Sequence, residues 1–401
     1  MAAIKPAAGK AGLLAGVSVL AGTIARADSS IDFKCLYYGE SNDRTQVIDP
    51  GLYYKHSWDK AGSLGLLLAY DSISGASPTG EIPTLDATAS ASSAGTIPKA
   101  EYTDTRKALG ASYDWRWGSH LPSVSLSYSK ESDYLSRGIS LVDSWELFNK
   151  RSTLHFGWGR TWDDIDPVNM NESFKKDSDS WSLGWTQVLG SRDLLDLSFS
   201  LTRLSGYLTD PYKLVTVGTT SLPEVRPDTR DRKAAILKLG HYFESRGALR
   251  MTYRYYWDDW KIDAHTLGLE FDQRIGKKLI LSPQLRLYRQ GAASFFAYEF
   301  AAPQPAMSSD YRLSSFWSWL VGLGFSTDIG RGASFNLGFT YQEQLGLDRV
   351  EPRPAAVVPL TARSAALLFE EGDGEGEGSP GSVSPADLKV VTATLGFSFK
   401  F

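Results

Sequence analysis

The last twelve residues, Val390 to Phe401, read VVTATLGFSFKF and alternate between two kinds of side chain. From Val391 onward every second residue is apolar, and the residues between are small or polar. An alternation with a period of two predicts a β-strand with one apolar and one polar face. The apolar face ends in three aromatic residues, Phe397, Phe399 and Phe401.

This aromatic ending resembles the terminal strand of bacterial outer-membrane barrels, which the barrel-assembly machinery reads as a signal. The resemblance implies that Phe397, Phe399 and Phe401 are an assembly signal. It also implies two partners, the assembly machinery and outer-membrane lipid. The rest of the chain is then expected to repeat this strand around a closed barrel.

The same alternation recurs in runs of about ten residues, enough for a tilted strand to cross a bilayer. In one run, Trp317, Trp319 and Val321 alternate with serine, leucine and glycine. Similar runs cover residues 152–162, 195–202 and 335–342.

The connections between these runs are of two kinds, and the two kinds alternate along the chain. Seven short turns lie near residues 58–62, 116–121, 148–151, 190–193, 244–247, 275–278 and 328–332. Eight connections of the second kind, most of them longer, lie near residues 42–44, 73–102, 134–138, 163–179, 206–232, 257–261, 291–313 and 343–388. Fifteen joints predict sixteen strands, and the side with short turns is periplasmic in such barrels.

The expected fold is therefore all-β: a transmembrane antiparallel up-and-down β-barrel of about 16 strands. Fourteen and eighteen strands are the alternatives, because residues 134–138 can also be interpreted as a kink within one strand. A soluble barrel or sandwich has no reason to sort its loops by length.

The amino-terminal residues 1–27 have the pattern of a cleaved secretory signal peptide, which leaves residues 28–401 as a single outer-membrane barrel domain. Lys5 and Lys10 precede a weakly apolar run, and residues 25–27 (Ala-Arg-Ala) form an A-x-A cleavage site. The run is too short for the ~20 apolar residues of a membrane anchor. We therefore expect the bacterial outer membrane as the location.

The composition is compatible with such a barrel and excludes other classes. Without the three basic residues of the signal, 42 − 3 = 39 basic and 46 acidic residues give a formal charge of −7. One cysteine excludes an internal disulfide. The mean hydropathy of −0.23 argues against a helical membrane protein but not against a barrel with a polar lumen. We expect no nucleic-acid partner and no cofactor.

The alternation also predicts which charged side chains face the lumen. Arg254 and Asp258 alternate with apolar neighbours, as does Asp71, while Glu131 and Asp133 continue a row of serines. A lysine or arginine facing lipid at the midplane would cost ~2–4 kcal/mol, so these groups are expected inside. They either brace the barrel wall as a network of ion pairs and hydrogen bonds, or form a constriction that filters solutes by charge.

The octapeptide DSISGASP at residues 71–78 predicts a rigid structural turn, formed by Ser74, Gly75, Ser77 and Pro78, that begins a long loop. It resembles the D-x-x-S-G-A-S-P motif of a Gram-negative outer-membrane β-barrel family of unknown function. Weaker matches to that family are Tyr38-x-Glu40 with Asp43-Arg44, Ser129-x-Glu131-x-Asp133-Tyr134, Asp258-Asp259-Trp260 and Asp310-Tyr311-Arg312.

The resemblance implies one polar cluster at the outer mouth, where loops on a rigid scaffold usually carry function. Its carboxylates are expected either to hold a hard cation such as Ca²⁺ or to pair with arginines and pin the loops; we favour pinning and expect no metal. The family's genes lie near those of periplasmic flavin-transfer and thioredoxin-like proteins, which implies periplasmic redox or export partners. The residues of the expected cluster are Glu40, Arg44, Asp71, Glu131, Asp133, Arg254, Asp258, Asp259, Asp310 and Arg312.

The sequence does not indicate an enzyme. It contains five histidines, of which His265 is expected to face lipid or the membrane interface, and no G-x-S-x-G or H-E-x-x-H motif. The acidic residues 370–385 are expected to form a solvated surface loop. The expected function is a porin-like channel or export conduit for small hydrophilic solutes. The alternative is a barrel plugged by side chains or loops that binds or anchors an envelope complex, possibly one linked to redox or flavin chemistry.

Overall fold

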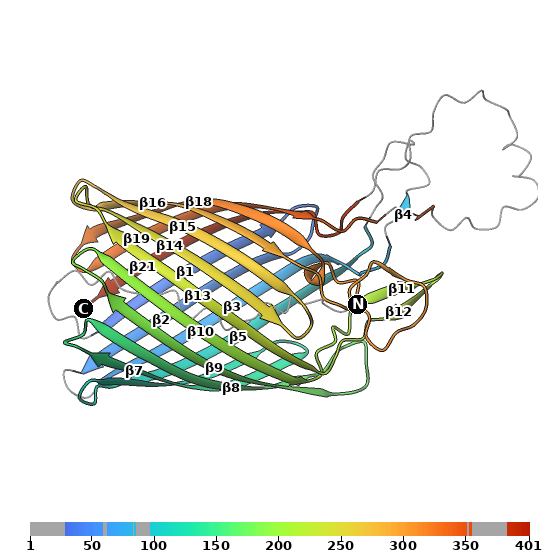
Figure 1. The fold of residues 1–401 in the computed structure, drawn as a ribbon, viewed down its shortest axis with the longest axis horizontal. Helices are drawn as coiled ribbons and strands as arrows, with labels where there is room; N and C mark the ends of the chain where they lie inside the picture. The colour runs from blue at the N-terminus through green and yellow to red at the C-terminus, as the bar shows by residue number, and fades with distance from the viewer. Residues whose placement is uncertain (1–28, 59–61, 83, 86–96, 351–352, 355–382) are drawn as a thin grey trace, which may run out of the picture.

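Sixteen antiparallel strands close into one barrel, as the sequence predicted (Figure 1). The computed structural model describes residues 29–58, 62–82, 84–85, 97–350, 353–354 and 383–401. The expected signal peptide, residues 1–27, and the acidic residues 370–382 lie outside the described residues. Each barrel strand pairs with the next one in the ring, and β21 (Leu388–Lys400) pairs with β1 (Ser29–Glu40) to close it.

The strand bounds follow the predicted runs. After β1 come β2 (Gln46–Trp58), β3 (Gly62–Pro78), β5 (Lys99–Asp114), β6 (His120–Lys130), β7 (Tyr134–Leu147), β8 (Ser152–Ile165) and β9 (Phe174–Val188). The ring continues with β10 (Asp193–Gly206), β13 (Thr229–Tyr242), β14 (Gly247–Asp258), β15 (Asp263–Ile275), β16 (Leu279–Gln290), β18 (Phe316–Gly330) and β19 (Ala333–Gly346), before β21. No helix among the described residues is long and apolar enough to span a membrane.

The outer face of the barrel is apolar. Leu68 on β3, Leu126 on β6 and Val321 on β18 are 52%, 57% and 44% exposed there. Phe397 and Phe399 of the terminal strand also lie on this face, 42% and 38% exposed. Exposing so much apolar area to water would be unfavourable by about 25 cal/mol per Å², so this surface is suited to lipid.

All seven short turns lie where the sequence predicted them, but the other connections are mostly shorter than expected. The expected loop at residues 73–102 spans only 79–98, because β3 and β5 stay paired as far as Pro78 and Lys99. The connection expected at residues 134–138 was placed wrongly: it is formed by residues 131–133, and β7 begins at Tyr134. Backbone hydrogen bonds extend a strand beyond its apolar run, which the side-chain pattern does not reveal.

The expected turn at Ser74, Gly75, Ser77 and Pro78 is also wrong, since these residues belong to β3. Gly75 has φ +137°, and a Cβ at that position would lie 1.9 Å from the carbonyl oxygen of Arg44. The glycine therefore lets β3 continue against the β1–β2 connection, where a side chain would collide.

Candidate functional site

Two connections fold together at one end of the barrel and form what we call the cap, defined as residues 207–228 and 291–315. The first contains β11 (Leu214–Val217) and β12 (Thr220–Pro223); the second contains β17 (Glu299–Phe300) and the 3₁₀ turn Tyr311–Leu313. β11 pairs with both β12 and β17, so one small sheet joins the two connections. Figure 1 shows β11 and β12 at the end of the barrel opposite the carboxyl-terminus.

The cap reaches across the mouth to the opposite wall. Residues 207–228 connect β10 and β13, the ninth and tenth strands of the ring, whereas β3 is the third. Lys213 nevertheless donates from Nζ to Ser77 Oγ over 3.0 Å and to the Pro78 carbonyl oxygen, both on β3. Tyr212 donates to Asp133 Oδ2 in the β6–β7 connection over 2.5 Å. The cap is therefore bonded to strands on both sides of the ring.

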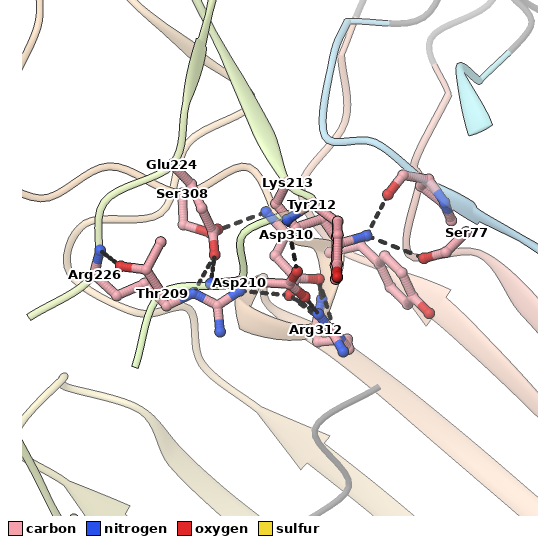
Figure 2. Close-up of polar contacts among 12 residues, drawn as sticks. Ser77, Thr209, Asp210, Tyr212, Lys213, Glu224, Arg226, Ser308, Asp310 and Arg312 are labelled. Carbon is pink, nitrogen blue, oxygen red and sulfur yellow. Dashed lines mark hydrogen bonds and ion pairs between the residues drawn. The ribbon is translucent and has the colours of Figure 1, made fainter. Parts of the chain in front are cut away.

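A buried ion-pair network holds the cap together (Figure 2). Its centre is Asp310, whose side chain is 0% exposed and lies 2.8 Å from Arg226 and 2.5 Å from Arg312. Arg226 also lies 2.7 Å from Glu224, and Arg312 lies 2.8 Å from Asp210. Arginine suits such a site because its guanidinium can bond two carboxylates at once. The network joins residues 207–228 to residues 291–315.

The network shifts the pKa values of its members. Burial alone would raise the pKa of Asp310, but Arg312, Lys213 and Arg226 outweigh burial and hold the pKa well below its usual range. Burial lowers the pKa of Lys213 to about 8, against the opposing attraction of Asp310. Burial raises the pKa of Glu224, although Arg226 opposes the shift. Asp310 is thus the fixed negative charge around which the cap is built.

Apolar side chains give the cap a core of its own. Val215 and Val217 of β11 are buried against Phe300 and Met307. A second cluster joins the cap to the β14–β15 connection, and a third joins it to the start of β18 and to the segment before β21. These clusters consist of Trp260, Ile262, Ala293, Phe295 and Leu313, and of Tyr311, Phe316 and Ala386. Packing of this kind stabilises a defined arrangement of loops.

Four of the predicted cluster residues lie around the cap residue Tyr311. Asp310 and Arg312 flank it in the chain. Arg44 is 2% exposed, lies over the Tyr311 ring at 5.2 Å and donates to the Pro385 carbonyl oxygen over 2.8 Å. Glu40, at the end of β1, accepts a hydrogen bond from Tyr38 over 2.6 Å. In this part of the site Arg312 joins the two connections through carboxylates, whereas Arg44 bonds a backbone carbonyl.

The other predicted residues lie in separate places on the wall. Asp71 pairs with Arg106 of β5, and Asp258 lies 2.5 Å from Arg230 of β13. Arg254 lies over the Tyr256 ring at 5.0 Å. Asp259 is exposed and accepts a hydrogen bond from the backbone of Asp231. The structure therefore contains several polar clusters near the mouth where the sequence suggested one.

Glu131 and Asp133 form one of these clusters with Asp104 of β5. One carboxylate oxygen from each lies within 4.8 Å of the others. The donor set is the kind that Ca²⁺ takes. Asp133 also accepts the hydrogen bond from Tyr212 of the cap, so the cluster is tied to the cap whether or not it holds an ion.

The lumen below the cap is lined by charged side chains that are accessible to solvent. Arg250 on β14 pairs with Glu270 and, over 2.7 Å, with Asp272 on β15. The side chains of Arg250 and Glu270 are 47% and 43% exposed, although both point inward. Lys238 on β13 is 53% exposed and lies 3.9 Å from Asp196. These pairs brace the wall and leave part of each charge facing the lumen.

Sequence reasoning missed the residues that form most of the cap network: Asp210, Lys213, Glu224 and Arg226. They lie in a connection that was treated only as a long loop. One signal was present, since Leu214-Val215-Thr216-Val217 is a short apolar β-pattern inside that loop. A loop exposed to solvent has no reason to carry such a pattern, so it could have indicated a folded cap.

The comparisons with known proteins identify the family. Residues 13–352 match the family described as Protein of unknown function (DUF3570). The chain belongs to this family. The resemblance to a barrel family of unknown function is thereby confirmed in its broad form, while the link to the octapeptide stays a prediction. A search of curated proteins finds no match.

Solved structures are similar to this chain at low sequence identity. The structure titled "Bacterial polysaccharide outer membrane secretin" has a TM-score of 0.51 and 8% identity, over 94% of this chain and 100% of that chain. CdiB from Acinetobacter baumannii has a TM-score of 0.47 and 9% identity, over 94% of this chain and 61% of its own. The CymD monoaromatic hydrocarbon channel has a TM-score of 0.41 and 8% identity, over 94% of this chain and 89% of its own. The first likeness shows that the chain has an outer-membrane barrel fold; identities this low carry no information about substrates.

Proposed function

We propose that this protein is an outer-membrane conduit for small hydrophilic solutes whose long-loop mouth is closed at rest by the cap. The observation that carries the proposal is the bonding of the cap across the ring, from Lys213 to Ser77 and Pro78 and from Tyr212 to Asp133. Passage would require the buried network around Asp310 to open. A continuously open porin is therefore the less favoured form of a channel.

The charged lining of the lumen favours the passage of solutes over a solid plug at mid-height. Sixteen-stranded barrels leave an aqueous channel unless something fills it. The half-exposed charges of Arg250 and Glu270 favour water and polar solutes over apolar ones. The mixed sign of these charges argues against strong selection for either cations or anions.

The proposal includes an orientation and a location. The apolar outer face supports insertion into the outer membrane, with the short turns in the periplasm and the cap outside. We expect secretion through a signal peptide at residues 1–27 and insertion by the barrel-assembly machinery. A solute leaving the cell would enter the lumen from the periplasmic end and meet the cap last.

Liposome swelling tests the proposal with sugars of increasing size as solutes. We expect slow swelling with the wild-type mature protein, and fast swelling after residues 214–223, the β11–β12 hairpin, are replaced by two glycines. Fast swelling with the wild type would contradict a closed mouth. Slow swelling with both proteins would contradict a conduit.

A second function is favoured by the apolar core of the cap. Val215, which is 0% exposed, and its neighbours make the cap a folded surface rather than a loose gate. Such a barrel could anchor an envelope complex: the cap would be bound from outside, and periplasmic redox or export proteins would contact the short turns. Cross-linking from a photoreactive residue placed at position 117, where Trp117 is 76% exposed in the β5–β6 turn, to a purified thioredoxin-like protein tests this function. A lack of specific cross-links would count against it.

A further inference from the structure

An apolar hollow lies on the outer face of the barrel wall, away from the cap. Its volume is about 570 Å³, and it spans five neighbouring strands, β1, β2, β3, β5 and β6. Leu52, Leu68, Leu109 and Tyr128 project outward around it and are between 40% and 52% exposed. The hollow is therefore a feature of the surface that contacts lipid.

The hollow has a structural cause in the sequence of β2. Register between β2 and β3 pairs Ile48 with Ser72 and resumes only at Gly51 with Ala69, so Pro50 has no registered partner on β3. Proline lacks the N–H that the ladder needs there. Pro50 is compact and projects outward between Ile48 and Leu52 of the same strand. The outer face is therefore low at Pro50, between taller side chains.

Two lysines lie at the edge of this hollow nearer the cap. Lys107 on β5 and Lys130 on β6 are directly opposite each other, two residue pairs beyond Leu109 and Tyr128 and on the same face. Both are exposed on the outer face. Opposed residues in such a pair have Cβ atoms roughly 4.5–5.5 Å apart, and like charges there are destabilising. A bound anion would relieve this repulsion.

Three outward-facing arginines at the same end of the barrel are neutralised by the chain itself. Arg137 lies 2.5 Å from Asp164, Arg160 lies 3.4 Å from Asp177, and Arg203 lies 2.8 Å from Asp231. Among the described residues, by contrast, no carboxylate lies within 4.0 Å of Lys107 or Lys130. Lys107 and Lys130 are thus two directly opposed cations without an acidic neighbour.

We infer that Lys107, Lys130 and the hollow form a binding site for an acylated, phosphate-bearing lipid of the outer leaflet. The lysines would bond one phosphate between them, since lysine carries its charge on a flexible stem that reaches the headgroup level. An acyl chain would occupy the hollow between Leu68 and Leu109. The inference rests on the proposed orientation with the cap outside, but not on conduction through the lumen.

Lipid titration followed by native mass spectrometry tests the site on the detergent-purified full barrel. Diphosphoryl lipid A is the probe, with fully dephosphorylated lipid A and phosphatidylglycerol as comparisons. We expect K107Q/K130Q to bind diphosphoryl lipid A roughly 30-fold more weakly than the wild type, from about 1 kcal/mol per lysine. The wild type should bind dephosphorylated lipid A as weakly as K107Q/K130Q binds diphosphoryl lipid A. Pro50→Phe, which fills the hollow without changing charge, should also weaken binding.

The matched control is Lys238→Gln, which removes a lysine from the lumen. This variant should bind the probe as the wild type does, and gel-shift heat modifiability should confirm that every variant is folded. Equal binding by K107Q/K130Q and the wild type would overturn the site. Tighter binding of phosphatidylglycerol than of lipid A would overturn the choice of leaflet. Swelling rates should not change in K107Q/K130Q, so this test and that of the conduit can fail independently.

Discussion

Asp310 shows how much a single residue contributes to the mouth of this barrel. Its carboxylate is fully buried and contacts two arginines that come from two directions in the chain, Arg226 and Arg312. Breaking a buried pair is far more costly than never forming it, because a charge is left without a partner in a medium of low dielectric constant. The burial of Asp310 therefore makes the closed cap sensitive to single substitutions.

We predict that Asp310→Asn loosens the cap, because the substitution removes the buried carboxylate that Arg226 and the half-buried Arg312 share. The expected cost is roughly 3–5 kcal/mol in the free energy of cap opening. Protease sensitivity of the cap in the folded barrel measures it. The control is Asp231→Asn, which breaks an exposed pair with Arg203 and should cost less than about 1 kcal/mol. Equal sensitivity in the two variants would show that Asp310 does not hold the cap.

Lys213 should make closure depend on pH. In the closed cap its pKa is about 8, whereas a free lysine has a pKa of about 10.4. Between these values the open state binds the extra proton, so the closed state becomes more stable as pH rises. Channel opening should fall roughly ten- to thirtyfold from pH 7 to pH 9.5. Lys213→Met should lose this part of the pH dependence of opening. A pH dependence identical to that of the wild type would show that Lys213 is not its source.

At the scale of the element, β3 links the barrel wall to the cap. Its carboxyl end provides Ser77 and Pro78 to Lys213, and its neighbour Gly75 packs against the carbonyl oxygen of Arg44. The backbone at Gly75 thus sets how closely the β1–β2 connection, with its buried Arg44, approaches the cap residue Tyr311.

We predict that Gly75→Ala destabilises this corner, because the new Cβ would lie 1.9 Å from the Arg44 carbonyl oxygen and the backbone must move. Gly118→Ala is the control, since Gly118 also has a positive φ (+60°) but no atom within 4 Å of the added Cβ. In the control, backbone strain alone should lower the free energy of unfolding by about 1 kcal/mol, and Gly75→Ala should lower it clearly more. The midpoint of thermal unfolding of the refolded barrel compares them. A midpoint for Gly75→Ala equal to that of the control would mean that the corner can relax.

At the scale of the whole molecule, the sequence predicts the barrel but not its cap. The number of strands, the side of the wall to which each side chain points and the positions of the short turns all follow from alternation, which is a local pattern. Leu66, Leu68 and Tyr70 face outward and Asp71 faces inward, as expected. The cap depends on contacts between distant residues, such as Lys213 with Ser77, 136 positions apart, and Ser308 with Glu224, 84 apart. No local pattern encodes such pairings. Asp310 and Arg312 were found only through a resemblance, and their partners Arg226 and Asp210 were not found.

The closed mouth is the central claim, and single-channel recording in a planar bilayer tests it most directly. The wild-type barrel should insert and stay mostly silent, with rare openings. The variant lacking residues 214–223 should give steady ohmic steps with weak ion selectivity, as expected for a water-filled lumen of mixed charge. Steady steps of the same size from the wild type would contradict the claim that the cap closes the mouth.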